Sequence, residues 1–90
     1  MKAEDRKSII KELKQIPGVG DSIANDLFVV GIKSINDLKR ENPELLYEKL
    51  CKIQNKRIDR CVLYVFREAV YYASNRKHKP ELLKWWNWKD

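Results

Sequence analysis

A tight turn with two glycines, Pro17-Gly18-Val19-Gly20, separates two segments of helical periodicity and constrains how the chain can fold. Glycine adopts positive φ angles and has no Cβ, so this turn lets the backbone reverse within a few residues. At the start of the following helix, several N–H groups lack an intrahelical partner and the helix dipole is positive, which favours an anion such as a phosphate. Two interpretations stay open: the turn only connects two helices, or its amides also bind a phosphate.

The composition is that of one small helical domain with a basic second half. The chain has 90 residues, enough for one modest core, of which 43% are hydrophobic, with only three glycines and three prolines. The formal net charge is +6, and residues 49–90 carry eleven basic and four acidic side chains. A positive excess of this kind favours an acidic partner, with nucleic acid first.

The two cysteines, Cys51 and Cys61, fall within apolar helical patterns, and the chain shows no signal peptide or membrane span. We therefore expect reduced, buried cysteines in a cytoplasmic protein that does not bind membranes. His78 is the only histidine and no C-x-x-C pair occurs, so a metal site lacks ligands and no cofactor is expected.

Periodicity and capping residues predict an all-α, compact domain of five to six helices that spans residues 1–90. The predicted helices cover about residues 4–15, 21–30, 34–40, 43–53, 58–74 and 80–88. Asp21 is expected to cap the second helix, and Gly31 with Ile32 to end it in a left-handed turn. Residues 34–37 resemble a capping box, and Asn42-Pro43 is typical of a helix start. Leu46, Leu50 and Ile53 are expected to form the inner face of the fourth helix.

Residues 58–74 are apolar around most of the predicted helix, which predicts that this helix is central. Its remaining stripe carries Arg60, Tyr64, Arg67 and Tyr71, which either pack against a terminal segment or stack on bases and hold phosphates. On the first helix, Lys7, Lys11 and Lys14 form a stripe that is either a solvated face or a nucleic-acid contact.

The end of the chain is rich in tryptophan, with Trp85, Trp86 and Trp88. We expect two of these indoles to dock on the central helix, while one remains available for stacking or for a partner. Residues 53–65 also repeat the pattern of residues 16–28 weakly, with polar residues in place of the glycines, which suggests a degenerate second hairpin.

Residues 16–38 resemble the helix-hairpin-helix motif: an apolar residue, Pro-Gly-Val-Gly, two polar positions, Ile-Ala, and later Gly-Ile before a Ser-capped helix. The whole chain resembles the small bacterial pathogenicity-locus family of helix-hairpin-helix proteins, some of which are labelled mitomycin resistance proteins. Residues 59–67, 69–73 and 80–90 carry this wider resemblance. It implies a hairpin motif over about residues 9–38 and binding of the DNA backbone without sequence readout, in DNA damage tolerance or repair.

The resemblance implies that the hairpin backbone of this chain contacts a phosphate and that nearby cations supply positive charge. The predicted DNA-backbone-binding residues are Lys14, Gly18, Val19, Gly20, Ser22, Lys52, Lys56, Arg57 and Arg60. Asp21 stands where many such hairpins have Lys or Arg, so the cations must offset its charge.

No nucleophile–base pair, paired carboxylates, phosphate loop with its lysine, or metal ligand set is evident, so we expect no enzyme. Two functions remain open. The first is a DNA-binding module with weak, salt-sensitive affinity. The second is a protein-interaction adaptor with a sterile-alpha-motif-like arrangement, which presents Trp88 or the acidic middle segment to a partner or to itself.

Overall fold

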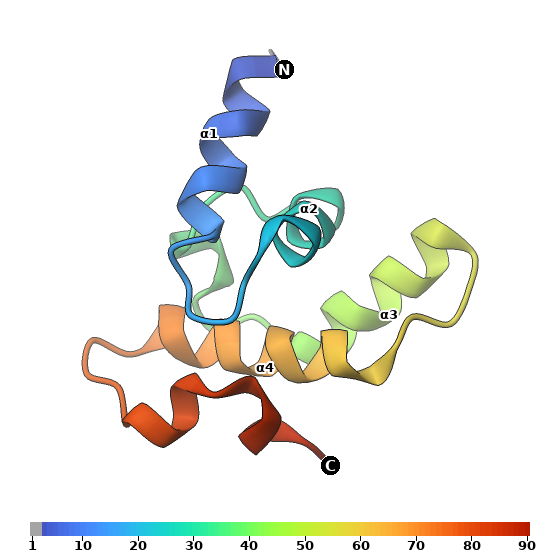
Figure 1. The fold of residues 1–90 in the computed structure, drawn as a ribbon. Helices are drawn as coiled ribbons and strands as arrows, with labels where there is room; N and C mark the ends of the chain where they lie inside the picture. Colours follow the sequence, from blue (N-terminus) through green and yellow to red (C-terminus); the bar gives the residue numbers. More distant parts are fainter. Residues whose placement is uncertain (1–2) are drawn as a thin grey trace.

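The computed structural model describes residues 3–90 as helices joined by short loops (Figure 1). The elements are α1 (Ala3–Leu13), α2 (Asp21–Val29), η1 (Asn36–Leu38), α3 (Pro43–Gln54), α4 (Arg60–Ser74), η2 (Pro80–Leu83) and η3 (Trp85–Trp88). No strand occurs in this range, which confirms the all-α prediction. The predicted domain also includes residues 1 and 2, which lie outside the described range. Within this range no helix is of the length and apolarity needed to cross a membrane.

Helix α4 lies at the centre of the fold, between the turn that joins α1 to α2 and the C-terminal segment (Figure 1). Its apolar face is buried, with Phe66 and Ala69 fully enclosed, and it contacts α3, η1, η2 and η3. The central helix is therefore confirmed. It begins at Arg60, two residues later than predicted, because Asp59 caps it by accepting a hydrogen bond from the Cys61 amide at 2.9 Å.

Helix α3 starts at the predicted cap and then diverges from α4. The Asn42 side chain accepts hydrogen bonds from the amides of Glu44 (2.9 Å) and Leu45 (3.3 Å), and Pro43 occupies the first helical position. Ile53, predicted on the inner face, is instead 50% exposed. The last turn of α3 diverges from α4 (Figure 1), which agrees with the partial exposure of Ile53.

Gly31 ends α2 in the predicted left-handed conformation, with φ +101°. Its amide donates to the Phe28 carbonyl and the Ile32 amide to the Leu27 carbonyl, both at 3.0 Å, and Ile32 is buried. These two bonds and the buried apolar residue define a Schellman cap.

The predicted third helix is only the short 3₁₀ helix η1. Its capping residues do act locally: Ser34 Oγ accepts from the Asp37 amide at 3.2 Å, and Asp37 Oδ2 accepts from the Lys33 amide at 3.0 Å. The chain leaves helical geometry at Lys39, and Arg40 takes a positive φ of 61°, which ends the element early.

The C-terminal segment forms η2 and η3 in place of the single helix predicted for residues 80–88, because Lys84 is extended between them. The count of five to six helices is thus corrected to four α-helices and three short 3₁₀ helices in the described chain. Trp85 packs against the core, and the Trp88 ring lies 5.6 Å from that of Tyr71, as expected for two docked indoles. Trp86 is 49% exposed, so the exposed indole is Trp86 and not Trp88.

Candidate nucleic-acid interface

The two glycines of the hairpin face different surroundings. Gly18 has φ +80°, and a Cβ at this position would lie 3.0 Å from Glu68 Oε1 and 3.3 Å from Trp85 Cδ1. A side chain at Gly18 would therefore point against Glu68 of α4 and Trp85 of η3, although the glycine itself is exposed. Gly20 is the N-cap of α2, and a Cβ there would meet no atom within 4 Å. The Gly20 side is therefore the open one.

The first amides of α2 are the free hydrogen-bonding groups on this open side. No side chain caps the helix, and the amides of Gly20, Ser22 and Ile23 have no hydrogen-bond partner among residues 3–90. Val19 offers no free amide of this kind, because its N–H donates to the Ile16 carbonyl at 3.1 Å and its side chain is buried. An anion at the hairpin would therefore meet the start of α2 and not the Val19 amide.

Asp21 does not cap α2, contrary to the prediction, because Gly20 holds the N-cap position. The Asp21 carboxylate instead forms an ion pair with Lys14, with Nζ and Oδ1 2.9 Å apart. The side chain of Asp21 is 83% exposed, so this pair contributes little to stability. Its consequence is electrostatic, since Lys14 offsets the negative charge beside the open amides.

Cations of α1 and the following Lys14 share a pocket with Asp21, the first residue of α2. A shallow pocket of about 300 Å³ is lined by Arg6, Lys7, Ile10, Lys11, Lys14 and Asp21. Arg6 is held against α2, where it donates to Asn25 and lies 5.5 Å above the Phe28 ring. Lys7 and Lys11 are absent from the predicted site, although their spacing with Lys14 is the sequence signal that identifies them.

The other predicted cations gather in a groove between α3 and α4. The groove has a volume of about 600 Å³, and its lining includes Lys52, Lys56, Arg57 and Arg60. Glu44 and Glu48 line the same groove, so its charge is mixed. The predicted site residues therefore fall into two groups: Lys14, Gly18, Val19, Gly20 and Ser22 at the hairpin, and the four cations at this groove.

Helix α2 extends from the predicted site residues at the hairpin toward those at the groove. Asp26 lies beside Gln54 at the end of α3 and near Lys56, while Asp21 lies at the hairpin. Burial raises the pKa of Asp26, and the hydrogen bond from Gln54 and the charge of Lys56 oppose this rise. Since each residue adds 1.5 Å of helix, Asp26 lies about 7.5 Å along α2 from Asp21.

Both cysteines are free thiols and half-buried, which corrects the prediction that they are buried. Cys51 faces the groove, where α3 stands apart from α4, and Cys61 lies in the first turn of α4. The neighbouring Asp59 carboxylate, and then burial, raise the pKa of the Cys61 thiol. The described residues contain no group of three or more His, Cys, Asp or Glu side chains that could hold a metal ion.

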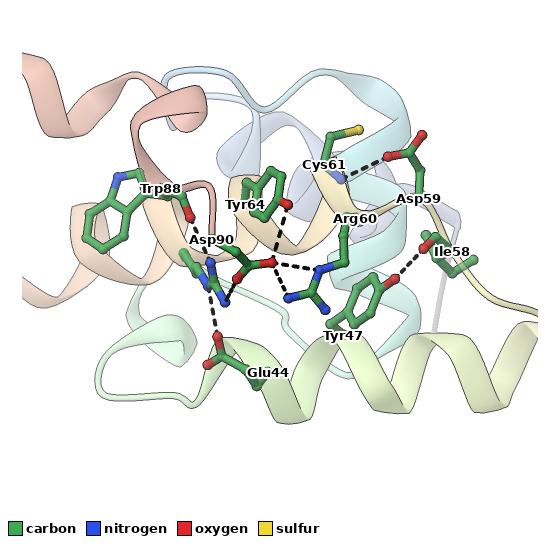
Figure 2. A network of polar contacts seen from close by, with 10 residues as sticks. Glu44, Tyr47, Ile58, Asp59, Arg60, Cys61, Tyr64, Trp88 and Asp90 are labelled. Carbon is green, nitrogen blue, oxygen red and sulfur yellow. Dashed lines mark hydrogen bonds and ion pairs between the residues drawn. The ribbon is translucent and has the colours of Figure 1, made fainter.

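The stripe of Arg60, Tyr64 and Arg67 on α4 converges on Asp90. Arg60 donates to Asp90 Oδ2 from Nε (3.0 Å) and Nη2, and Arg67 Nη2 donates to Oδ1 at 2.9 Å. The Tyr64 hydroxyl donates to Oδ2 at 3.4 Å, and Figure 2 shows the Asp90 carboxylate between Arg60 and Tyr64. Hydrogen bonds from the two arginines, Arg60 first, lower the pKa of Asp90.

Arg67 is the more enclosed of the two arginines, with a side chain 19% exposed against 47% for Arg60. It also donates to the Trp88 carbonyl at 2.7 Å and to Glu44 Oε2 at 2.8 Å (Figure 2). These contacts favour the structural interpretation of the stripe, in which it packs against the terminal segment. Arg60, a predicted DNA contact, is therefore engaged by Asp90 in this conformation.

Glu68 lies directly behind the hairpin and is completely buried. Neither carboxyl oxygen has a hydrogen-bond partner in the described chain, and burial raises its pKa to about 8. Burial without a partner penalises the charged carboxylate, so the raised pKa favours the protonated form of Glu68. Its neutral form adds no negative charge behind the open amides of α2.

Comparison with known families identifies the family of the chain. The family model described as Cdd1, pathogenicity locus, matches residues 6–90. The chain belongs to this family. The mitomycin resistance protein McrB of Streptomyces lavendulae is 30% identical to the chain over 77 residues, which cover 86% of this chain and 70% of the relative. No solved structure matches the chain.

Proposed function

We propose that this pathogenicity-locus protein is a sequence-independent DNA-binding module in which the open start of α2 binds one backbone phosphate. The observation that carries the proposal is the uncapped helix start at Gly20, which faces open space and is followed by Asp21, a residue that shares a pocket with Lys7, Lys11 and Lys14. Free amides position a phosphate, and lysines neutralise it and its neighbours. In this proposal the protein catalyses no reaction and is located in the cytoplasm.

The geometry of the hairpin supports its assignment as a helix-hairpin-helix motif. Helices α1 and α2 pack against each other, Gly18 takes a left-handed conformation and Gly20 begins the second helix. Asn55, at the position equivalent to Gly18 in the weak internal repeat, also has a positive φ of 52°. We therefore interpret the α3–α4 connection as a degenerate second hairpin.

The groove between α3 and α4 extends the proposed DNA path. Lys56 lies near α2, whose N-terminus forms the first phosphate seat, so one stretch of backbone reaches both. Contacts of this kind carry no base information, which accounts for binding without sequence readout. The name of the Streptomyces relative, a mitomycin resistance protein, fits a role in DNA damage tolerance.

Neutralising the lysines beside the hairpin should weaken DNA binding. We expect the K7A/K11A double variant to bind a short duplex roughly tenfold more weakly at low salt, with a slope of log K on log salt smaller by about 0.9 for each phosphate that the lysines no longer neutralise. Fluorescence anisotropy at several salt concentrations measures both quantities. The K77A/K79A variant removes the same charge from an exposed loop elsewhere. Equal losses of affinity in the two variants, or no binding by the wild type at low salt, would contradict the proposal.

Covering the open amides should weaken binding without unfolding the protein. Gly20 has an extended φ of −96° and free space around it, so the Gly20→Val variant is expected to change the free energy of unfolding by less than about 1 kcal/mol. The branched side chain would crowd the Ser22 and Ile23 amides, so DNA affinity should fall several-fold. Chemical denaturation and the same anisotropy titration test both parts. Unchanged affinity in a folded variant would place the DNA elsewhere.

The second candidate function is a protein-interaction adaptor, and the exposed Trp86 favours it. Its indole is 49% exposed, whereas Trp88 is half-buried and donates to the Leu82 carbonyl at 2.9 Å. If this indole is an interaction surface, sedimentation should show concentration-dependent association that Trp86→Ala abolishes and Lys7→Ala leaves intact. A monomer at all concentrations, with DNA binding unchanged in Trp86→Ala, favours the DNA-binding function.

A further inference from the structure

We propose that Arg60, Tyr64 and Arg67 form a phosphate-binding site that Asp90 of the same chain occupies, and that a DNA backbone phosphate replaces the Asp90 carboxylate. This inference rests on the proposed DNA-binding function and adds to it a second place where the protein holds a phosphate. It also assigns a regulatory role to Asp90, which competes with DNA for the two arginines.

The donors of this site are arranged around one oxyanion. Two guanidinium groups and one hydroxyl point their hydrogens at the two oxygens of Asp90 (Figure 2). Arginine forks match phosphate as well as carboxylate geometry, because both present oxygens at a similar spacing. The Arg67 guanidinium also lies 5.6 Å from the centre of the Tyr64 ring, which orients it.

Part of this site is held in place by contacts that do not involve the Asp90 side chain. Arg67 has two further hydrogen bonds of this kind, to Glu44 and to the Trp88 carbonyl. Glu44 also offsets part of its charge, so a single phosphate can replace a single carboxylate without a large excess of positive charge. Arg60 is held to the terminal segment through Asp90, so its guanidinium is released when Asp90 leaves.

The site is open to solvent and continuous with the groove between α3 and α4. The side chains of Arg60 and Asp90 are 47% and 50% exposed, so a competing anion has access to the pair. Arg60 lines the groove that also contains Lys52, Lys56 and Arg57. An exposed ion pair of this kind holds weakly, whereas a DNA phosphate arrives with neighbouring phosphates and releases counterions. These features favour DNA as the competitor.

Removing the competing carboxylate should strengthen DNA binding. We expect Asp90→Asn and Asp90→Ala to bind a short duplex roughly three- to tenfold more tightly at low salt, with a salt slope steeper by about 0.9 for the additional phosphate that is bound. Glu41→Gln is the matched control, because it makes the same change in net charge at an exposed site outside the groove. The gain in affinity should disappear in the double variant Arg60→Gln/Asp90→Asn. Thermal melts establish that each variant is folded.

The outcomes separate this proposal from the hairpin function. If the wild type binds DNA and loses affinity in K7A/K11A, but Asp90→Asn binds no more tightly than Glu41→Gln, the Asp90 site is overturned and the hairpin function stands. If no form binds DNA, both are overturned. Titration of Asp90→Asn with inorganic phosphate, followed by the NMR signals of the arginine Nε groups, should shift those of Arg60 and Arg67. Oligoglutamate that binds Asp90→Asn as tightly as DNA of equal charge would instead identify an acidic protein as the ligand.

Discussion

Replacing Gly18 by alanine will destabilise the protein by about 2–4 kcal/mol. Part of this cost is backbone strain, because a residue with a Cβ loses about 1–2 kcal/mol in the left-handed conformation that Gly18 adopts at φ +80°. The rest is overpacking, since the new methyl group would lie 3.0 Å from Glu68 Oε1 and 3.3 Å from Trp85 Cδ1. Glu68 is fully buried, so its carboxyl would have to shift by a few tenths of an ångström within the packed interior. Denaturant unfolding of the two proteins measures the difference.

Gly20→Ala is the matched control for this variant, because it makes the same chemical change two residues away. Its Cβ would meet nothing within 4 Å, so the free energy of unfolding should stay within about 1 kcal/mol of the wild type. Coupling adds a second check: in a Glu68→Ala background, Gly18→Ala should cost less than in the wild type, because only its backbone strain and the contact with Trp85 remain. Similar destabilisation by the two substitutions would show that Gly18 does not pack against α4 as described.

The features that sequence reasoning predicted well are those whose partners lie within a few residues. Asn42 caps amides two and three residues ahead. At the end of α2, the Gly31 amide donates to a carbonyl three residues back, and the Ile32 amide donates to a carbonyl five residues back. The central position of residues 58–74 also follows from their apolar circumference alone. Such signals place helices correctly, since caps and periodicity act locally along the chain.

The orientation of the tryptophans shows where the same reasoning fails. The α-helical period of 3.6 does not apply to η3, which is a 3₁₀ helix with three residues per turn. Residues three apart share a face in both helix types, so the spacing pairs Trp85 with Trp88 and separates Trp86, but only the packed structure shows that the pair turns toward α4 and that Trp86 is exposed. Helix type depends on the packing of the segment as a whole, which the residues themselves do not reveal.

The candidate site was only partly predictable for a related reason. Arg60, Tyr64 and Arg67 share one helical face by spacing, but their common partner Asp90 lies 23 to 30 residues away. Glu68 follows buried Val65 by three residues and precedes buried Ala69, so periodicity does place it inward. A charged side chain is expected on the surface, so the sequence alone does not predict that Glu68 is buried. Its burial follows from the packing of the hairpin and Trp85 over it.

Glu68 should make the stability of the protein fall as the pH rises from about 4.5 to about 8. Its ordinary pKa is 4.5, and burial raises this to about 8 in the folded state. Between these values the folded protein holds a proton that the unfolded chain has released, so raising the pH favours unfolding. The contribution is fully present below pH 4.5 and is lost as the pH passes the folded pKa; the shift corresponds to roughly 5 kcal/mol. Urea unfolding between pH 5 and 9 measures the slope.

The Glu68→Gln variant isolates this contribution, because it keeps the shape of the side chain and removes the titration. The difference between the wild-type and Glu68→Gln stability curves cancels every other titrating group and should decline steadily between pH 5 and 8. A carboxyl ¹³C NMR titration of Glu68 gives the folded pKa directly. Since Gly18 is the backbone nearest to the carboxyl, charging Glu68 should also speed hydrogen exchange at the hairpin amides before the whole protein unfolds. A flat difference curve, with Glu68 titrating near 4.5, would show that the carboxyl reaches water and is not enclosed behind the hairpin.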